Sequence, residues 1–299
     1  MRARCGIDIG GTGVKTVLID EDRKILAEDA FDTNSVNGSA AFLKALEDCA
    51  KRLKAAAPEA EWVSCGIGCT GPVDIETGII LNPFTLPGLE GFGLTEAVGE
   101  LLGIPVYIDN DANTAHLGEA AVLENDPGNT ALITLGTGVG CSVRIGGKLY
   151  RVPGGIHPEI GHTSCGVDSD IRCYCGRTNC MENILSGTAV NRDAFRFFGS
   201  TPEEALDACD SPEKKLFREN ILCGLSNACE TLAGIFDSKV IIIAGGMMAF
   251  YEKYFIEQVN RRMKTLVPDF GSAKVIPAKL GKNSGKLGAA VLAMMRDKE

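Results

Sequence analysis

Residues 5–19 read CGIDIGGTGVKTVLI, and this stretch decides the fold. Two apolar runs flank Gly10-Gly11-Thr12-Gly13, so the pattern predicts two strands joined by a tight glycine turn. Residues 131–145, ALITLGTGVGCSVRI, repeat the pattern around Gly136-Thr137-Gly138. The repeat predicts two similar halves, each with a glycine-rich hairpin, and a ligand cleft between them.

The rest of the chain alternates predicted strands with predicted helices, which indicates an α/β fold. Apolar residues at helical spacing predict helices at 39–57, 94–102, 112–123, 213–236, 250–266 and 286–296. Short apolar runs predict strands at 24–29, 62–69, 105–108, 129–135, 141–145, 148–151, 239–244 and 274–278. The sequence has no low-complexity segment or long linker that would separate independent modules.

The composition excludes several classes of protein. The 299 residues carry 39 acidic and 30 basic side chains, a formal net charge of −9. This balance disfavours a broad surface for nucleic acid or anionic membrane, which needs clustered Lys and Arg. The first residues do not read as a secretory signal, and no apolar run reaches the roughly 20 residues that span a bilayer. We therefore expect a cytoplasmic protein without nucleic-acid or membrane partners.

The first glycine turn has the chemistry of a phosphate site. Gly10 and Gly11 bare their backbone amides, Thr12 adds a hydroxyl and Lys15 adds a charge. The turn lacks the Lys-Ser/Thr end of a Walker loop, and a strand rather than a helix follows it. An ordinary hairpin is the alternative. The second turn, at Gly136, Thr137 and Gly138, favours phosphate binding, because two such hairpins could grip a nucleotide from both sides.

Asp109-Asn110-Asp111-Ala112-Asn113 stands where a predicted strand ends and a helix begins, which is where α/β proteins bind ligands. A carboxylate there can act as a general base toward a hydroxyl. The alternative is a simple Asx turn and helix N-cap.

Three of the twelve cysteines, Cys173, Cys175 and Cys180, lie within eight residues of one another. Together with His162 they match a tetrahedral Cys₃His zinc site, and four protein ligands would make the ion structural. The alternatives are uncoordinated thiols, Cys165 as a substitute ligand, and His157 as a less suitable histidine.

Glu159 and Glu182 flank this metal loop. Their carboxylates could accept hydrogen bonds from sugar hydroxyls, and ordinary surface charge is the alternative.

Together these residues resemble the ROK family of bacterial sugar kinases and repressors. The resemblance covers nearly the whole chain. It rests on motifs whose order and spacing are specific in combination: Asp8-Ile9-Gly10-Gly11-Thr12, Asn110-Asp111, Leu135–Gly140, Glu159-Ile160-Gly161-His162, Cys173-Tyr174-Cys175-Gly176 through Glu182, Ala244-Gly245-Gly246, and Leu280-Gly281 with Gly288-Ala289-Ala290. It implies an actin-like ATPase fold of the hexokinase type, with two α/β lobes around a central cleft. The lobes would be residues 1–112 and 113–285, and a closing helix at 286–299 would pack back on the first lobe.

The resemblance also implies site residues and cofactors. Asp111 would be the base that takes the proton from a sugar hydroxyl, usually the one on C6. The sugar would be held by Asn110, Glu159, His162 and Glu182, and structural Zn²⁺ by His162, Cys173, Cys175 and Cys180. Asp8 would help position Mg²⁺. ATP would lie against Gly10, Gly11, Thr12, Lys15, Gly136, Thr137 and Gly138, with its adenosine near Gly245 and Gly246. A homodimer or higher homo-oligomer is expected.

Two departures from the family pattern bear on the substrate. His157-Pro158 resembles the fructokinase branch, whereas the Cys-Tyr-Cys-Gly loop resembles glucokinases and N-acetylhexosamine kinases. A Pro-Asn-Leu sugar contact is replaced by Asn82-Pro83-Phe84-Thr85, so Asn82 or Thr85 would supply the contact.

The predicted function is ATP-dependent phosphorylation of a hexose, on the 6-hydroxyl of glucose or of a related or N-acetylated hexose. A fructokinase or glycoside kinase is the alternative within the family. Alternatives of another class are a sugar sensor without catalysis, a ROK transcriptional regulator and a zinc-knuckle nucleic-acid binder. A regulator would need a helix-turn-helix before the first glycine turn, and a nucleic-acid binder would need basic and aromatic residues in its loop.

Overall fold

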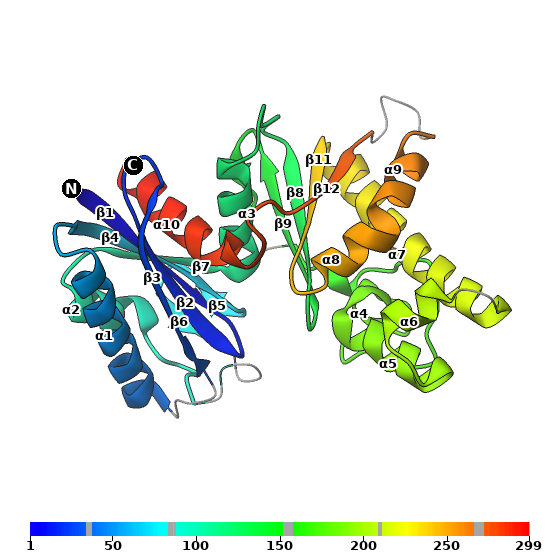
Figure 1. The fold of residues 1–299 in the computed structure, drawn as a ribbon, viewed down its shortest axis with the longest axis horizontal. Helices are drawn as coiled ribbons and strands as arrows, with labels where there is room; N and C mark the ends of the chain where they lie inside the picture. The colour runs from blue at the N-terminus through cyan, green and yellow to red at the C-terminus, as the bar shows by residue number, and fades with distance from the viewer. Residues whose placement is uncertain are drawn as a thin grey trace. The chain divides into compact units, whose positions relative to one another are not determined.

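The computed structural model describes residues 1–33, 38–82, 86, 88–151, 158–208, 211–265 and 272–298. The chain divides into two compact units (Figure 1). The first consists of Met1–Glu124, Arg151–His157 and Asn283–Glu299, and the second of Asn125–Tyr150 and Pro158–Lys282. Each unit contains its own five-stranded sheet.

The first unit is built on a mixed sheet with the strand order β3-β2-β1-β4-β7. The strands are β1 (Arg2–Ile9), β2 (Gly13–Ile19), β3 (Ile25–Asp32), β4 (Glu61–Cys69) and β7 (Val106–Asn110). The predicted hairpin is confirmed, because β1 and β2 pair antiparallel around the first glycine turn. β4 runs parallel to β1, and β7 runs parallel to β4. A small ribbon of β5 (Val73–Asp74) and β6 (Ile79–Ile80) lies outside this sheet.

Helices cover both faces of the first sheet. The cluster formed by α1 (Gly38–Ala56) and α2 (Leu94–Leu102) with the sheet includes Phe42 and Leu94 from the helices and Ile7 from β1. The residues of β1 that alternate with Ile7 face α10 (Ser284–Arg296), which packs against β1, β4 and α3 (Asp111–Ala121). This alternation is the two-residue period of a strand.

Glycines let α10 approach the sheet closely. A Cβ added at Gly66 would lie 1.8 Å from the carbonyl oxygen of Ala289, and one added at Gly288 would lie 1.6 Å from that of Thr114. The close α3–α10 packing keeps α3 in the first unit, which extends to Glu124. The lobe boundary expected after residue 112 therefore differs from the observed division.

The second unit repeats the plan of the first. Its sheet has the order β10-β9-β8-β11-β12, formed by β8 (Thr130–Leu135), β9 (Val139–Ile145), β10 (Lys148–Leu149), β11 (Val240–Ala244) and β12 (Lys274–Pro277). β9 is antiparallel to β8 and β10, while β11 is parallel to β8 and β12. The internal repeat predicted from the two glycine turns is confirmed by this shared order and direction.

The described part of the second unit contains six α-helices: α4 (Met181–Leu185), α5 (Gly187–Phe198), α6 (Pro202–Asp207), α7 (Pro212–Phe236), α8 (Met248–Tyr251) and α9 (Glu257–Met263). The π-helical η3 (Glu252–Ile256) lies between the last two. The helix predicted over 250–266 is thus divided by a π-helical segment.

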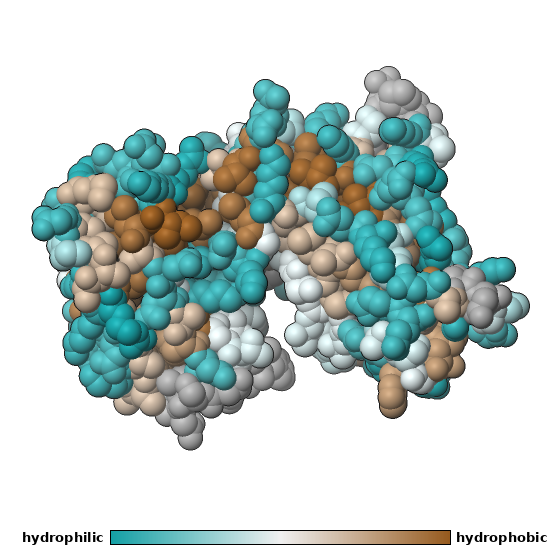
Figure 2. Space-filling model, in the orientation of Figure 1, coloured by the Kyte–Doolittle hydropathy of each residue, from teal (hydrophilic) through white to brown (hydrophobic). Residues whose placement is uncertain are grey.

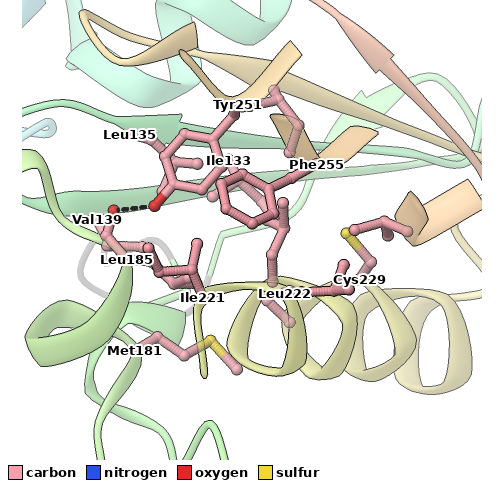
Figure 3. Packing of buried hydrophobic residues seen from close by; sticks show 14 of the residues in the cluster. Ile133, Leu135, Val139, Met181, Leu185, Ile221, Leu222, Cys229, Tyr251 and Phe255 are labelled. Carbon is pink, nitrogen blue, oxygen red and sulfur yellow. Dashed lines mark hydrogen bonds between the residues drawn. The ribbon is translucent and has the colours of Figure 1, made fainter. Parts of the chain in front are cut away.

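Figure 3 shows the aromatic rings of Tyr251 and Phe255 in the core, against aliphatic residues of β8 and α7. The Tyr251 hydroxyl donates to the carbonyl oxygen of Leu185 at 2.6 Å, so this buried polar group is satisfied.

Hydrophilic residues cover most of the face that Figure 2 shows. Among the exposed large hydrophobic residues, Tyr174 stands out with 83% of its surface accessible. Within the described ranges, none of the helices is both long and apolar enough to cross a membrane.

Candidate functional site

The strand-to-helix junction of the first unit places Asn110 and Asp111 side by side. Asn110 is the last residue of β7 and caps α3, since its Oδ1 accepts a hydrogen bond from the Ala112 amide at 2.8 Å. Oδ1 of Asp111 accepts from the same amide at 2.8 Å. The helix N-cap that the sequence analysis gave as an alternative for this segment is therefore present. These bonds use one oxygen of each side chain, so capping is compatible with a second role for Nδ2 of Asn110 and Oδ2 of Asp111.

A second carboxylate, that of Asp8, lies near Asp111. Burial raises the pKa of Asp111 to about 7, and the like charge of Asp8 acts in the same direction. Burial also raises the pKa of Asp8, against the opposing charges of Lys15 and Lys286. Lys15 Nζ is 3.9 Å from Asp8 Oδ2. The first unit thus holds a buried carboxyl group, Asp111, whose pKa is raised to about 7, beside a second carboxyl group, Asp8, of the kind that Mg²⁺ prefers.

The position of Asp8 depends on the start of α10. A Cβ added at Gly285 would lie 2.5 Å from the carboxyl carbon of Asp8. The side chain of Lys286, which lowers the pKa of Asp8, is nearly buried and is paired with Glu28 at 2.6 Å. Sequence reasoning missed Lys286, because it lies far along the chain from Asp8 and outside the motifs.

The first glycine turn is braced by the next strand. The Gly10 amide donates to the Gly13 carbonyl at 3.0 Å, which closes the turn. The Thr33 hydroxyl donates to the Gly10 carbonyl at 3.0 Å, and the Thr33 amide donates to the Thr12 carbonyl at 3.3 Å. Since Asp8 faces Lys15 across the hairpin, the predicted residues of this unit form one group.

The second glycine turn gathers the other predicted nucleotide residues. The Gly136 amide donates to the Gly138 carbonyl at 3.0 Å. Gly245 has a φ of +93°, and a Cβ there would lie 2.5 Å from the carbonyl oxygen of Leu135, so this position requires glycine. A Cβ on Gly136 would lie 3.9 Å from the Gly246 amide nitrogen. The structure therefore brings the turn and the Gly245-Gly246 pair together.

The start of α5 also reaches this turn, which the sequence analysis did not predict. The Gly187 amide donates to the Gly136 carbonyl at 2.6 Å, and the Thr188 hydroxyl donates to the Thr137 carbonyl at 2.8 Å. Ser186 caps the helix through the Ala189 amide. A serine ahead of a helical stretch is the signal that could have found this helix start.

Glu182 links the second glycine turn to the metal loop. It lies in the first turn of α4, and its Oε2 accepts a hydrogen bond from the Val139 amide at 2.7 Å. A Cβ added at Gly138 would lie 2.9 Å from Oε1, so a larger residue there would displace the carboxylate. Burial raises the pKa of Glu182, His162 opposes this shift and Glu159 adds to it. The three predicted sugar-binding residues of this unit are therefore close enough to interact.

The four predicted zinc ligands form one cluster. The ligand atoms of His162, Cys173, Cys175 and Cys180 all lie within 4.8 Å of one another, and His162 Nδ1 is 3.8 Å from Cys173 Sγ. Tetrahedral zinc with these donors separates ligand atoms by about 3.5–3.8 Å, so a small contraction would complete the site. The residues present fit a zinc ion.

The geometry also addresses the alternative ligands. In the described residues, Cys165 is not part of the cluster, and its thiol faces the Val167 carbonyl at 3.5 Å. His157 lies outside the described residues. Among the described residues, the structure brings His162, and not Cys165, together with the three clustered cysteines.

Tyr174, between two of the cysteines, holds the other side of the His162 ring. Its hydroxyl oxygen lies 2.7 Å from His162 Nε2, and the two rings meet edge to face at 4.8 Å. A partner on Nε2 leaves Nδ1 to face the thiols, which is how histidine ligands are commonly oriented. The sequence analysis quoted Tyr174 in the loop but assigned it no role.

Asn82 is buried, with 1% of its surface exposed. Its Nδ2 donates to the Gly71 carbonyl at 2.5 Å, which ties it to the loop after β4. Thr85, the alternative sugar contact, lies outside the described residues. A sugar contact from either residue stays a prediction.

Comparison with known proteins identifies the family of the chain. The family model described as ROK family matches residues 4–296. A glucokinase of Thermotoga maritima is 29% identical, over 97% of each chain. An N-acetylmannosamine kinase of Vibrio cholerae is 30% identical, over 95% of this chain and 96% of the relative.

A solved structure extends the likeness to three dimensions. It is a ROK family glucokinase from Streptomyces griseus in complex with glucose and AMPPNP, with a TM-score of 0.77 and 27% identity, over 98% of this chain and 99% of that chain. The fold is the actin-like, hexokinase-type α/β fold that the sequence predicted. With a family model matched from residue 4 to residue 296, the chain belongs to the ROK family.

Proposed function

We propose that this protein transfers a phosphoryl group from ATP to a hydroxyl of a hexose, with Asp111 as the general base. The observation that carries the proposal is Asp111 itself, at the junction of β7 and α3, with its pKa raised to about 7. A base whose pKa lies near the working pH is partly ionised and can still accept a proton as a sugar hydroxyl attacks. Relatives named glucokinase and N-acetylmannosamine kinase support the reaction class.

The phosphate side of the reaction needs positioning and charge neutralisation more than covalent chemistry. We assign the phosphates to the amides and hydroxyls of the two glycine turns, and the adenosine to Gly245 and Gly246. Asp8 and Lys15 would determine the charge of the protein beside the phosphates. Asp8 would hold Mg²⁺, which supplies positive charge to the phosphates when bound.

The sugar would be held by side chains that carry hydrogen-bond donors or acceptors. Nδ2 of Asn110 is a donor beside Asp111, while Glu159 and Glu182 accept from hydroxyls. His162, Cys173, Cys175 and Cys180 would bind Zn²⁺, whose role is to fix the loop that carries His162 and precedes Glu182. Zinc in this role is structural and takes no part in proton transfer.

The proposed substrate is glucose or a related or N-acetylated hexose, phosphorylated at the 6-hydroxyl. The relatives' names support both kinds of sugar. Fructose phosphorylation, suggested by His157-Pro158, is the second candidate. A cytoplasmic location and a homo-oligomeric state stay predictions of the sequence.

ADP release with Mg-ATP tests the proposal on a panel of glucose, fructose, mannose, allose, N-acetylglucosamine and N-acetylmannosamine. We expect turnover on one of these sugars, and its loss by more than about a hundredfold in Asp111→Asn. Absence of turnover on every sugar, with folded and zinc-loaded protein, would contradict a hexokinase. The non-catalytic sensor would then be supported by sugar binding without ADP release.

A further inference from the structure

A buried ion pair lies directly beside the proposed catalytic residues. Asp109 has 1% of its surface exposed. Its Oδ2 accepts from Arg151 Nε at 3.1 Å and also from Arg151 Nη2. This two-pronged contact brings both nitrogens to one carboxylate oxygen, and its charge-assisted hydrogen bonds are stronger than bonds between neutral groups. Arg151 comes 42 residues later in the chain, in the segment 151–157 that belongs to the first unit.

The other oxygen of Asp109 holds the junction of β7 and α3. Oδ1 accepts from the Asn110 amide at 2.8 Å and from Asn113 Nδ2 at 2.7 Å. Asn113 is fully buried in the first turn of α3. Asp109 therefore spans the two residues that we assign to the reaction, Asn110 and Asp111, and bonds to the chain on both sides of them.

Arg151 offsets the free-energy cost of burying the Asp109 carboxylate. A charge taken out of water is costly unless a partner of opposite charge and hydrogen bonds compensate it. Removing the guanidinium would leave Asp109 buried with only its two neutral donors. The carboxylate would then turn toward water, and both Asn110 and Asn113 would lose their acceptor.

We propose that Arg151 is a positioning residue: by holding Asp109, it sets Asn110 and Asp111 in place for the sugar hydroxyl. The proposal rests on the function proposed above. It assigns the effect to the sugar side, because Asp109 bonds to Asn110 and Asn113 and to neither glycine turn in the bonds that the structure records.

A second ion pair, between the buried Arg144 and the more exposed Asp126, provides a control. Arg144 is 7% exposed, and its Nη2 donates to Asp126 Oδ2 at 2.8 Å. This pair belongs to the second unit and bonds to Thr130 and Gly147, which have no proposed role in the reaction. Arg144→Gln therefore removes a comparable ion pair without touching the proposed site.

The experiment compares Arg151→Gln, Arg151→Lys, Asp109→Asn and Arg144→Gln with the wild type. On the sugar that the wild type phosphorylates, Arg151→Gln should raise the sugar KM at least tenfold and leave the ATP KM within about twofold. Arg151→Lys should recover part of the loss, because it keeps the charge but not the two-pronged bond. Arg144→Gln should lower the melting temperature and leave both KM values unchanged.

A second readout does not depend on turnover. Amide hydrogen exchange of the peptide that contains Asn110 to Asn113 should be at least tenfold faster in Arg151→Gln than in the wild type, and unchanged in Arg144→Gln. Unchanged exchange and an unchanged sugar KM in Arg151→Gln would overturn the inference. Loss of stability equal to that of Arg144→Gln, with wild-type kinetics, would also overturn it. If the wild type phosphorylates no sugar, the proposed function fails, while the exchange measurement still decides whether Arg151 fixes this junction.

Discussion

The two sheets have the same strand order, yet one register position holds glycines in the first sheet and large aliphatic residues in the second. Gly6 of β1 pairs with Gly66 of β4, and the equivalent partners in β8 and β11 are Leu132 and Ile242. Both aliphatic residues are buried, with at most 1% of their surface exposed. The backbone of the first sheet thus packs directly against the backbone of α10. At the same position of the second sheet, large side chains are buried.

This difference explains why the two neighbouring carboxyl groups, Asp8 and Asp111, lie in the first unit. Asp8 follows Gly6 by two residues and lies against the first turn of α10. The equivalent position in the second sheet is Thr134. The glycines let α10 and α3 pack closely, and so hold Asp8 and Asp111 near each other. In the second unit, the chain between β10 and β11 carries the metal loop and Glu182 instead. We infer that Asp111 of the first unit accepts the proton, with Asn110 beside it as a sugar contact, and that the second unit supplies further sugar contacts through Glu182.

The largest expected effect comes from breaking the glycine contact. In Gly66→Ala, the new Cβ would lie 1.8 Å from the Ala289 carbonyl, so α10 must move. We expect the free energy of unfolding to fall by at least about 3 kcal/mol, at the upper end for overpacked sites. Ile242→Val, at the equivalent position, should cost only about 1 kcal/mol. Chemical denaturation measures both, and equal losses would show that the two positions are packed alike.

The next largest effect is on the pH dependence of turnover. Asp111 must be ionised to accept a proton, and its pKa is raised to about 7. The value of kcat/KM should therefore be constant above this pKa and fall about tenfold per pH unit below it, or about a hundredfold by pH 5. Steady-state rates between pH 5 and 9, with melting curves at each pH, give the profile. A profile that stays flat down to pH 5 would remove Asp111 as the base.

A smaller effect tests the metal loop of the second unit. Tyr174→Phe removes the hydroxyl that faces His162 Nε2. Loss of such a partner weakens metal binding by about 10–100-fold, and we expect about tenfold because the loop is exposed. Competition with a chromogenic chelator measures zinc affinity. Tyr254→Phe, whose hydroxyl donates to Asp207 at 2.7 Å, is the control. Equal zinc affinity in Tyr174→Phe and wild type would leave the tyrosine without this role.

The smallest effects compare the two glycine turns directly. One threonine hydroxyl braces each turn: Thr33 on the Gly10 carbonyl and Thr188 on the Thr137 carbonyl. Thr33→Val and Thr188→Val should each raise the ATP KM by about threefold to fivefold, the cost of about one hydrogen bond. The sugar KM should not change. An effect in only one variant would mean that a single turn binds the phosphates.

Much of the site was accessible from sequence because its signals are local. The two Gly-Thr turns predicted the repeated hairpins, and the position of Asn110-Asp111 at a strand end predicted a junction that the structure confirms. The closely spaced Cys173, Cys175 and Cys180 predicted a cluster that the structure brings together with His162.

The rest depends on contacts between distant segments. Asp109 and Arg151 are 42 residues apart, and neither lies in a pattern that indicates its partner. The close approach of α10 needs Gly6 and Gly66, which read as ordinary strand residues until the helix is placed on them. The π-helical segment within 250–266 keeps helical spacing, so apolar periodicity could not reveal it.

The separate roles of Asp111 in proton transfer and Glu182 in sugar recognition are tested most directly by calorimetric titration of Asp111→Asn with the sugar that the wild type phosphorylates. The account predicts a Kd within about threefold of the wild-type value, although turnover is lost, and a much weaker Kd for Glu182→Gln. If Asp111→Asn loses sugar binding as completely as Glu182→Gln, or keeps its turnover, the two residues do not divide chemistry and recognition in this way.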